Sequence, residues 1–196
     1  LSAVGEQHPQ LCWRVNVDGL YNVLEIARLH DLRLFCPSSI AVFGPETPRE
    51  QTPQETVLRP TSMYGVTKVT GERLCDYYAT RYGVDVRGIR YPGLISSETP
   101  PGGGTTDYAV EIFYEAVRRG RYTCFVRADT VLPMMYMPDA IRATLQLMAA
   151  PRSELRHHAD FNLAALSFSA GELAAEIRKH LPGFECTFVP DYHQAI

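Results

Sequence analysis

The chain has 196 residues, of which 45% are hydrophobic and 21% charged, and its formal net charge is −3 at pH 7. This length and composition are typical of one globular domain or a large part of one. The negative charge, without a dense cluster of lysines and arginines, argues against a nucleic-acid-binding surface, and no apolar run is long enough to span a bilayer.

The 5 cysteines are odd in number and widely spaced, and no two of them form a C-x-x-C pair. We therefore expect a reduced, intracellular protein, which would be cytoplasmic in a bacterium or mitochondrial in a eukaryote. The 6 histidines show no H-E-x-x-H spacing, so the sequence predicts no metal site.

Predicted helices and strands alternate along the first half of the chain. Apolar residues recur at helical spacing over 15–30, and the short apolar run at 33–39 ends in small polar residues. A proline-rich loop without periodicity follows. The next helix is predicted over 64–82, where Gly83 supplies a stop, and the alternating segment 84–92 predicts a strand that ends at proline.

The alternation continues after a glycine-rich loop. Helices are predicted over 108–119, 138–149 and 169–180, and a capping box opens the last of them. Strands are predicted at 122–126, 160–164 and 185–189. Repeated alternation of this kind predicts an α/β fold with a mostly parallel sheet.

The segment YGVTK places Tyr64 four residues before Lys68 at the start of a predicted helix. A phenol is a poor base at neutral pH. A cation one helical turn away on the same face favours the phenolate, and so does the partial positive charge of a helix N-terminus. The pair is therefore a candidate for proton transfer, although the same spacing also occurs without function in many helices.

Two hydroxyl side chains, Ser38 and Ser39, end the strand predicted before this helix. Ligands of parallel α/β sheets bind beyond the carboxyl ends of the strands. A hydroxyl to orient a substrate, a phenol to exchange its proton and a lysine to tune the phenol together form a proton-transfer site. The alternative is that the two serines only cap the end of the strand.

Five motifs in the chain resemble the extended short-chain dehydrogenase/reductase family, which is also the NAD-dependent epimerase/dehydratase family. They are SSIAVFG, YGVTK, RYPGLIS, GGGTTDYA and LPMMYMPD. Within that family the set is similar to the L-threonine 3-dehydrogenases. The resemblance covers nearly the whole chain, and it implies a Rossmann-like, doubly wound parallel sheet with a small C-terminal α/β part that binds the substrate.

The resemblance also implies a reaction, the NAD-dependent oxidation of L-threonine to 2-amino-3-oxobutyrate. Tyr64 would act as the general base and Lys68 would tune it. Ser39 matches the position that holds the reacting hydroxyl, and Ser38 lies beside it in the substrate site.

The resemblance assigns further positions to the cofactor NAD. Lys68 and Tyr64 would bind the nicotinamide ribose. Pro92, Gly93 and Leu94 match the segment that packs against the nicotinamide. Asn16 matches a helix asparagine that supports a proton relay in many relatives, with a simple helix-start residue as the alternative.

The glycine-rich loop predicts the amino-acid end of the substrate site. Thr106 precedes a helix whose free backbone N–H groups would suit a carboxylate, and Asp107 could pair with an ammonium group or only favour the helix dipole. A flexible linker is the alternative. Ser2 resembles a substrate-contacting position as well.

The chain departs from the family in one respect, because it has no G-x-x-G-x-x-G fingerprint and no acidic residue following one. We therefore expect an internal piece of a longer enzyme. Residues 1–92 would be the later portion of a dinucleotide-binding domain, and residues 93–196 would be a smaller part that carries the substrate-binding loop.

Two other functions stay open at this point. One is a nucleotide-sugar epimerase or dehydratase on the same scaffold, and the other is a non-catalytic binding or oligomerisation module. The family resemblance implies a homodimer through the helices at 15–30 and 64–82.

Overall fold

The computed structural model describes residues 2–163 and 166–195. Helices and strands alternate along most of this range, which confirms the predicted α/β class. The contacts divide the chain into two compact units. The larger unit consists of residues 2–91 and 139–163, and the smaller unit consists of residues 92–138 and 166–195.

The larger unit begins with a helical run, continues with short strands and a long helix, and is completed by a returning segment. Its elements are α1 (Ser2–Gln7), α2 (Pro9–Trp13), η1 (Arg14–Asp18), α3 (Gly19–Leu29), β1 (Leu34–Phe35), β2 (Ser38–Ser39), η2 (Ile40–Val42), α4 (Met63–Tyr82), β3 (Val86–Arg87), β4 (Ile89–Tyr91), η3 (Arg152–Glu154) and β8 (Phe161–Asn162). Helix α6 (Met137–Ala149) has all but its first two residues in this unit.

All strand pairs of the larger unit are parallel. β1 pairs with β3, and β4 lies between β2 and β8. In the register of β2 and β4, Ser38 is opposite Arg90 and Ser39 is opposite Tyr91. The strand β2 consists of the two predicted serines. Ligands of parallel sheets bind beyond the carboxyl ends of the strands, and Ser39 lies at this end of β2.

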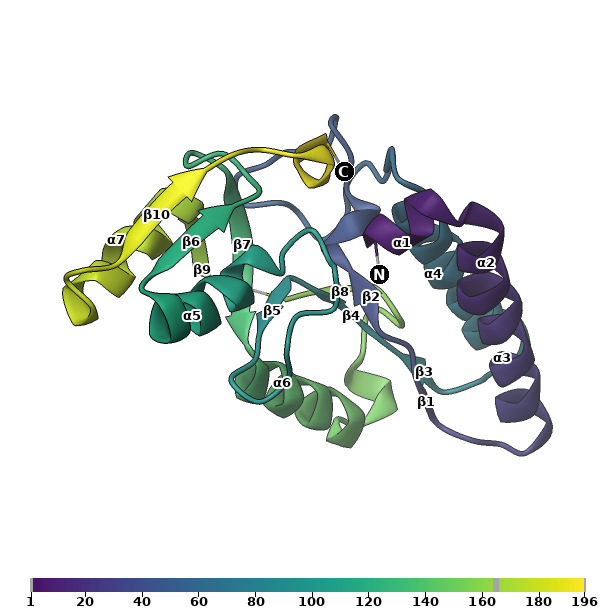
Figure 1. Ribbon diagram of the computed structural model, residues 1–196. Helices are drawn as coiled ribbons and strands as arrows, with labels where there is room; N and C mark the ends of the chain where they lie inside the picture. Colours follow the sequence, from purple (N-terminus) through teal and green to yellow (C-terminus); the bar gives the residue numbers. More distant parts are fainter. Residues whose placement is uncertain (1, 164–165, 196) are drawn as a thin grey trace. The chain divides into compact units, whose positions relative to one another are not determined.

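Helix α4 forms where the sequence predicts it. The Ser62 side chain accepts a hydrogen bond from the Gly65 N–H, and Gly83 ends the helix with a φ of 74°, a conformation that glycine adopts without steric cost. Helices α3 and α4 pack side by side (Figure 1). Their shared apolar core is Leu24, Ala27, Cys75, Tyr78, Ala79, Val84, Val86 and Ala159.

The smaller unit packs two helices against short strands. Its elements are β5 (Gly93–Ile95), α5 (Tyr108–Arg119), β6 (Arg121–Cys124), β7 (Val131–Tyr136), β9 (Leu166–Ser169), α7 (Ala170–His180), β10 (Glu185–Phe188) and η4 (Tyr192–Ala195). β6 and β10 run parallel and side by side (Figure 1), and β7 lies between β5 and β9. Its buried core includes Tyr108, Ile112, Cys124, Met134 and Ile177.

Several local features differ from the sequence prediction. The helix expected at 15–30 is preceded by α2 and contains a π-helical turn, η1. Strand β7 was not predicted because it contains Pro133, which normally argues against a strand, and its partner β9 is antiparallel. The capping box before α7 is confirmed, since Ser169 and Glu172 exchange both hydrogen bonds.

None of the helices described is both long and apolar enough to cross a membrane.

Candidate functional site

Tyr64 and Lys68 lie on one face of the first turns of α4. The Lys68 ammonium nitrogen is 5.4 Å from the centre of the Tyr64 ring. It also donates a hydrogen bond of 2.7 Å to the carbonyl oxygen of Pro37, just before β2. Both side chains are half-buried. The cation is therefore held beside the Tyr64 ring and bonded to the residue that precedes the two serines.

Ser39 ends β2 and begins η2. Its hydroxyl oxygen accepts a hydrogen bond of 3.2 Å from the Ala41 N–H, which caps that short helix. The hydroxyl hydrogen is not used in this bond, and the side chain is half-buried. Ser39 thus combines the capping role offered as its alternative with a hydroxyl that can still donate.

Gly65 brings the start of α4 close to the turn that follows Ser39. A Cβ at this position would collide with the carbonyl oxygen of Ala41 and with the ring of Pro60. Only glycine permits such an approach of two backbones. Gly65 therefore sets how near the start of α4 lies to the turn after β2.

Ser38 is buried, with 6% of its surface exposed, and its hydroxyl donates a hydrogen bond of 2.6 Å to Glu72. Glu72 is itself bound by Arg90 through two hydrogen bonds. Sequence reasoning did not single out either residue, although Glu72 continues the Tyr64 and Lys68 face by one more helical turn. This geometry favours a structural role for Ser38 over substrate contact.

Asn16 lies in the π-helical turn η1, a type of irregularity that is frequent at functional sites. Its side-chain amide donates to the Thr67 hydroxyl at 2.9 Å, and that hydroxyl donates to the Tyr64 carbonyl at 2.8 Å. The amide also lies 3.5 Å from the Cys12 sulfur. Asn16 is thus joined to the backbone of Tyr64 through one side chain.

Helix α1 also reaches the start of α4. The Glu6 carboxylate accepts a hydrogen bond of 2.5 Å from the Met63 N–H, and sequence reasoning missed this residue. An acidic side chain at this place satisfies an otherwise unpaired donor of α4. Ser2 belongs to the same helix, but its side chain lies outside the described part of the chain.

The predicted nicotinamide-packing residues open the smaller unit. Pro92 and Gly93 are buried, and Leu94 pairs with Met135 in the register of β5 and β7. Gly93 lies against the Met134 sulfur and the Thr106 side chain, so that the strand and the loop before α5 are in contact.

Asp107 organises the glycine-rich loop. Its carboxylate accepts hydrogen bonds from the N–H groups of Gly102 at 2.7 Å and Gly104 at 2.8 Å. Three of the backbone N–H groups around the start of α5 that we expected to be free are occupied, because those of residues 107, 109 and 110 donate to the carbonyl oxygens of residues 104, 106 and 107. The carboxylate site itself stays a prediction.

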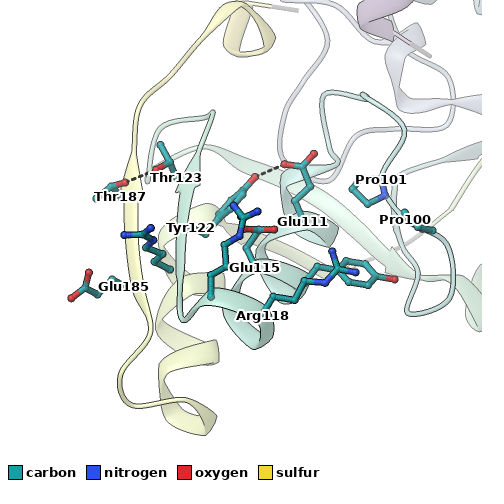
Figure 2. A pocket seen from close by; sticks show the side chains of 12 residues that line it. Pro100, Pro101, Glu111, Glu115, Arg118, Tyr122, Thr123, Glu185 and Thr187 are labelled. Carbon is teal, nitrogen blue, oxygen red and sulfur yellow. Dashed lines mark hydrogen bonds and ion pairs between the residues drawn. The ribbon is translucent and has the colours of Figure 1, made fainter.

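The smaller unit also contains an open pocket of about 630 Å³ (Figure 2). It includes none of the predicted site residues. Tyr122 donates a hydrogen bond of 2.9 Å to Glu111 on its wall, and burial followed by this bond raises the pKa of Tyr122. Three arginines and three glutamates line it, so its charge is balanced: Arg118, Arg119, Arg121, Glu111, Glu115 and Glu185.

No group of three or more metal-ligating side chains occurs within residues 2–163 and 166–195. All five cysteines are free thiols, and Cys75 and Cys124 are fully buried. The side chains that the structure brings near the start of α4 as a candidate site are Ser39, Tyr64 and Lys68, all in the larger unit.

Known proteins of high similarity share both the sequence and the fold. The chain is 53% identical over 191 residues to a Staphylococcus haemolyticus protein described as an uncharacterized epimerase/dehydratase. It is 51% identical over 197 residues to the mitochondrial L-threonine 3-dehydrogenase of Bos taurus. The chain spans 60% of the first protein and 52% of the second.

Solved structures match over the whole chain. The L-threonine dehydrogenase of Phytophthora infestans gives a TM-score of 0.97 at 55% identity, and the chain covers 64% of it. The holo form of a GalE-like L-threonine dehydrogenase from Cupriavidus necator gives 0.97 at 56% identity, again with 64% covered. These matches confirm the predicted Rossmann-like class.

A UDP-N-acetylglucosamine 4-epimerase from Methanobrevibacter ruminantium shares the fold alone, with a TM-score of 0.79 at 16% identity. The profile of the NAD dependent epimerase/dehydratase family matches residues 2–164, which is most of the chain. The chain therefore belongs to the NAD dependent epimerase/dehydratase family.

Proposed function

We propose that the protein to which this chain belongs is an NAD-dependent L-threonine 3-dehydrogenase. The observation that carries the proposal is the anchored Tyr64–Lys68 pair, with the Lys68 nitrogen 5.4 Å from the centre of the Tyr64 ring and bonded to the carbonyl of Pro37, just before β2. The similarity to proteins described as L-threonine 3-dehydrogenases supports the choice of substrate.

In the proposed reaction Tyr64 removes the proton of the threonine hydroxyl. Lys68 holds its positive charge beside the ring, where it stabilises negative charge that develops during the proton transfer. Ser39 donates its free hydroxyl hydrogen to the substrate oxygen and orients it. When bound, NAD supplies the acceptor for the hydride that leaves C3, and the product is 2-amino-3-oxobutyrate.

The residues present fit the nicotinamide end of NAD. Lys68 has three N–H donors, and only one of them is occupied by the Pro37 carbonyl. The remaining donors and the Tyr64 hydroxyl suit a ribose diol. Asn16 would hold the helix beside them, and Pro92, Gly93 and Leu94 would pack against the ring.

The amino-acid end of the substrate is assigned to Thr106, Asp107 and Ser2. For Asp107 we favour a role in holding the loop, because its carboxylate already accepts hydrogen bonds from two loop N–H groups. It would shape the loop that covers the substrate, and a direct pairing with the ammonium group would require it to release one of these bonds.

The experiment is to assay the full-length protein for NAD reduction with L-threonine and, in parallel, for turnover of UDP- and dTDP-sugars. Threonine-dependent reduction with no sugar turnover is the expected result. The sugar arm is needed because the family and the Staphylococcus relative carry epimerase/dehydratase descriptions. Turnover of a sugar without turnover of threonine would replace the proposal by a nucleotide-sugar epimerase or dehydratase.

We also propose that the protein forms a homodimer through the helices at 15–30 and 64–82. The supporting observation is that these helices expose several large apolar side chains, which a subunit interface would bury. On the described residues they are Val15, Tyr21, Val23, Ile26, Leu29, Val66, Tyr77 and Tyr82.

A further inference from the structure

Glu72 and Arg90 form a buried ion pair behind the candidate site. Glu72 is 2% exposed and so is Arg90. The Arg90 Nε donates to Glu72 Oε1 at 2.9 Å, and its Nη2 donates to Glu72 Oε2 at 2.7 Å. This parallel, two-bond arrangement fixes the orientation of both side chains.

The pair joins α4 to the end of β2. Glu72 Oε1 also accepts the Ser38 hydroxyl hydrogen at 2.6 Å, and Ser38 lies opposite Arg90 in the register of β2 and β4. One helical turn earlier, Lys68 binds the carbonyl of Pro37. The residues immediately before Ser39 are therefore held by α4 at two successive points.

A second set of contacts fixes Arg90 from the other side. Its Nη1 donates to the Gln54 carbonyl at 3.3 Å and to Asn162 Oδ1 at 3.1 Å, and its Nη2 lies 3.6 Å from Asp160 Oδ2. Arg90 thus has defined partners on the long loop, on β8 and on α4. Such a network specifies one geometry more strongly than a single bond does.

We propose that the Glu72–Arg90 pair is a positioning element, which sets the place of Ser39 relative to Tyr64 through Ser38. The proposal rests on the proposed function, because Ser39 and Tyr64 are taken as the groups that handle the substrate hydroxyl. Buried ion pairs are poor sources of net stability, since desolvation offsets much of their attraction. Their value here is geometric: a small displacement of a substrate-orienting group lowers the rate strongly.

The matched control is an arginine on β3, the strand that precedes β4 in the chain. Arg87 on β3 is 0% exposed and is also held by a carboxylate, with bonds of 2.8 and 3.0 Å to Asp85. Its other donors bind carbonyls of Leu147, Met148 and Ala150. These hydrogen bonds of Arg87, within the described part of the chain, do not involve Ser38 or Glu72. Loss of Arg87 therefore tests stability without a direct effect on the serines.

The experiment compares Arg90→Lys, Ser38→Ala and Arg87→Lys in the full-length enzyme. We expect both arginine variants to melt at lower temperature, because lysine keeps the charge but loses the two-bond geometry. Only Arg90→Lys and Ser38→Ala should lower kcat for threonine, by up to about 100-fold for Arg90→Lys, with the KM for NAD little changed. Ser38→Ala removes a single hydroxyl, so it keeps the test open if Arg90→Lys does not fold.

Crystal structures of the three variants separate this proposal from the proposed function. Displacement of Ser39 from Tyr64 in Arg90→Lys and Ser38→Ala, but not in Arg87→Lys, supports the positioning role even if wild-type protein does not oxidise threonine. An unmoved Ser39 with unchanged kcat would overturn it. So would a rise in the KM for threonine alone in Ser38→Ala, which would place Ser38 in direct contact with the substrate.

Discussion

At the scale of single residues, the proposed proton transfer depends on the charge that Lys68 places beside Tyr64. The ammonium nitrogen is fixed at 5.4 Å from the ring by the Pro37 carbonyl. A fixed positive charge at that distance can stabilise negative charge that develops during proton transfer. The hydrogen bond to Pro37 favours the lysine conformation that faces the ring.

Replacing Lys68 by alanine is therefore expected to lower kcat for threonine by about 100-fold, because the proton transfer loses a fixed positive charge. The measurement is the steady-state rate of threonine-dependent NAD reduction. Lys179→Ala is the control, because Lys179 is exposed and pairs with Glu176. An unchanged kcat for Lys68→Ala would contradict the role assigned to the lysine.

A second prediction for a single residue concerns Gly65. A methyl group here collides with the Ala41 carbonyl, so Gly65→Ala must push α4 from the turn after Ser39. We expect destabilisation of about 1–3 kcal/mol, as for overpacked sites, together with a fall in kcat. Urea unfolding and steady-state kinetics measure the two effects.

The control for this change is Gly19→Ala. Gly19 is helical, and the nearest atom to an added Cβ is the Arg14 carbonyl oxygen at 3.7 Å, an ordinary contact. Alanine favours helices by about 1 kcal/mol over glycine, so this variant should be neutral or more stable. Equal stability and equal kcat for the two variants would show that the close approach at Gly65 affects neither folding nor catalysis.

At the scale of elements, β3 is locked in place by Arg87 and Asp85. The hydrogen bond from Arg87 lowers the pKa of Asp85, with the nearby charges of Arg87 and Arg33 adding to it against the effect of burial. A carboxyl group whose pKa is depressed on folding stabilises the fold above its unfolded pKa. That stabilisation is lost as the pH falls through the folded pKa.

Asp85→Asn should therefore lower the free energy of unfolding at neutral pH. Its difference from wild type should shrink as the pH falls below the ordinary value of 3.8. Urea unfolding at neutral pH and at about pH 3 measures the difference. Asp129→Asn serves as the control, since that carboxylate is 76% exposed and pairs with an exposed arginine. A constant difference at all pH values would argue against the lowered pKa.

The sequence predicted those elements whose signals are local. Helix α4 was predicted to within one residue because Gly83 closes it, and the structure shows Ser62 as the cap that opens it. The capping box of α7 was equally readable. Strand β7 was missed because Pro133 argues against a strand, and its pairing with β9 depends on residues distant in sequence.

In the candidate site, too, local features could be predicted and contacts between distant residues could not. The spacing of Tyr64 and Lys68 is readable from one helix, and the structure adds their distance. The buried partners Glu72 and Arg90 were not found, because no local sequence pattern predicts that a helix glutamate and a strand arginine will contact each other. The same glutamate also accepts the Ser38 hydrogen bond. Some of the N–H donors that we expected to be free at the start of α5 are occupied, because Asp107 and the loop carbonyls form a tight turn there.

At the scale of the whole molecule, the exposed apolar side chains of α3 and α4 predict association. Ile26 on α3 is 51% exposed, and Ile26→Glu would place a charge in the proposed interface. We expect wild type to sediment as a dimer and the variant to sediment as a monomer. Leu145→Glu is the control, because Leu145 on α6 is exposed at 65% but lies outside the two helices.

A monomeric wild type would remove the dimer from the account. One solved structure of high similarity is described as a monomeric L-threonine 3-dehydrogenase, at 58% identity. Sedimentation velocity over a range of concentrations distinguishes the two states.

The most direct measurement is the rate of threonine-dependent NAD reduction by full-length wild type, Tyr64→Phe and Tyr77→Phe. Phenylalanine removes only the hydroxyl, and Tyr77 is an exposed tyrosine on the same helix. Loss of turnover in Tyr64→Phe, with wild-type rates in Tyr77→Phe and intact folding in both, is the predicted result. Undiminished turnover by Tyr64→Phe would contradict the proposal that this phenol takes the substrate proton.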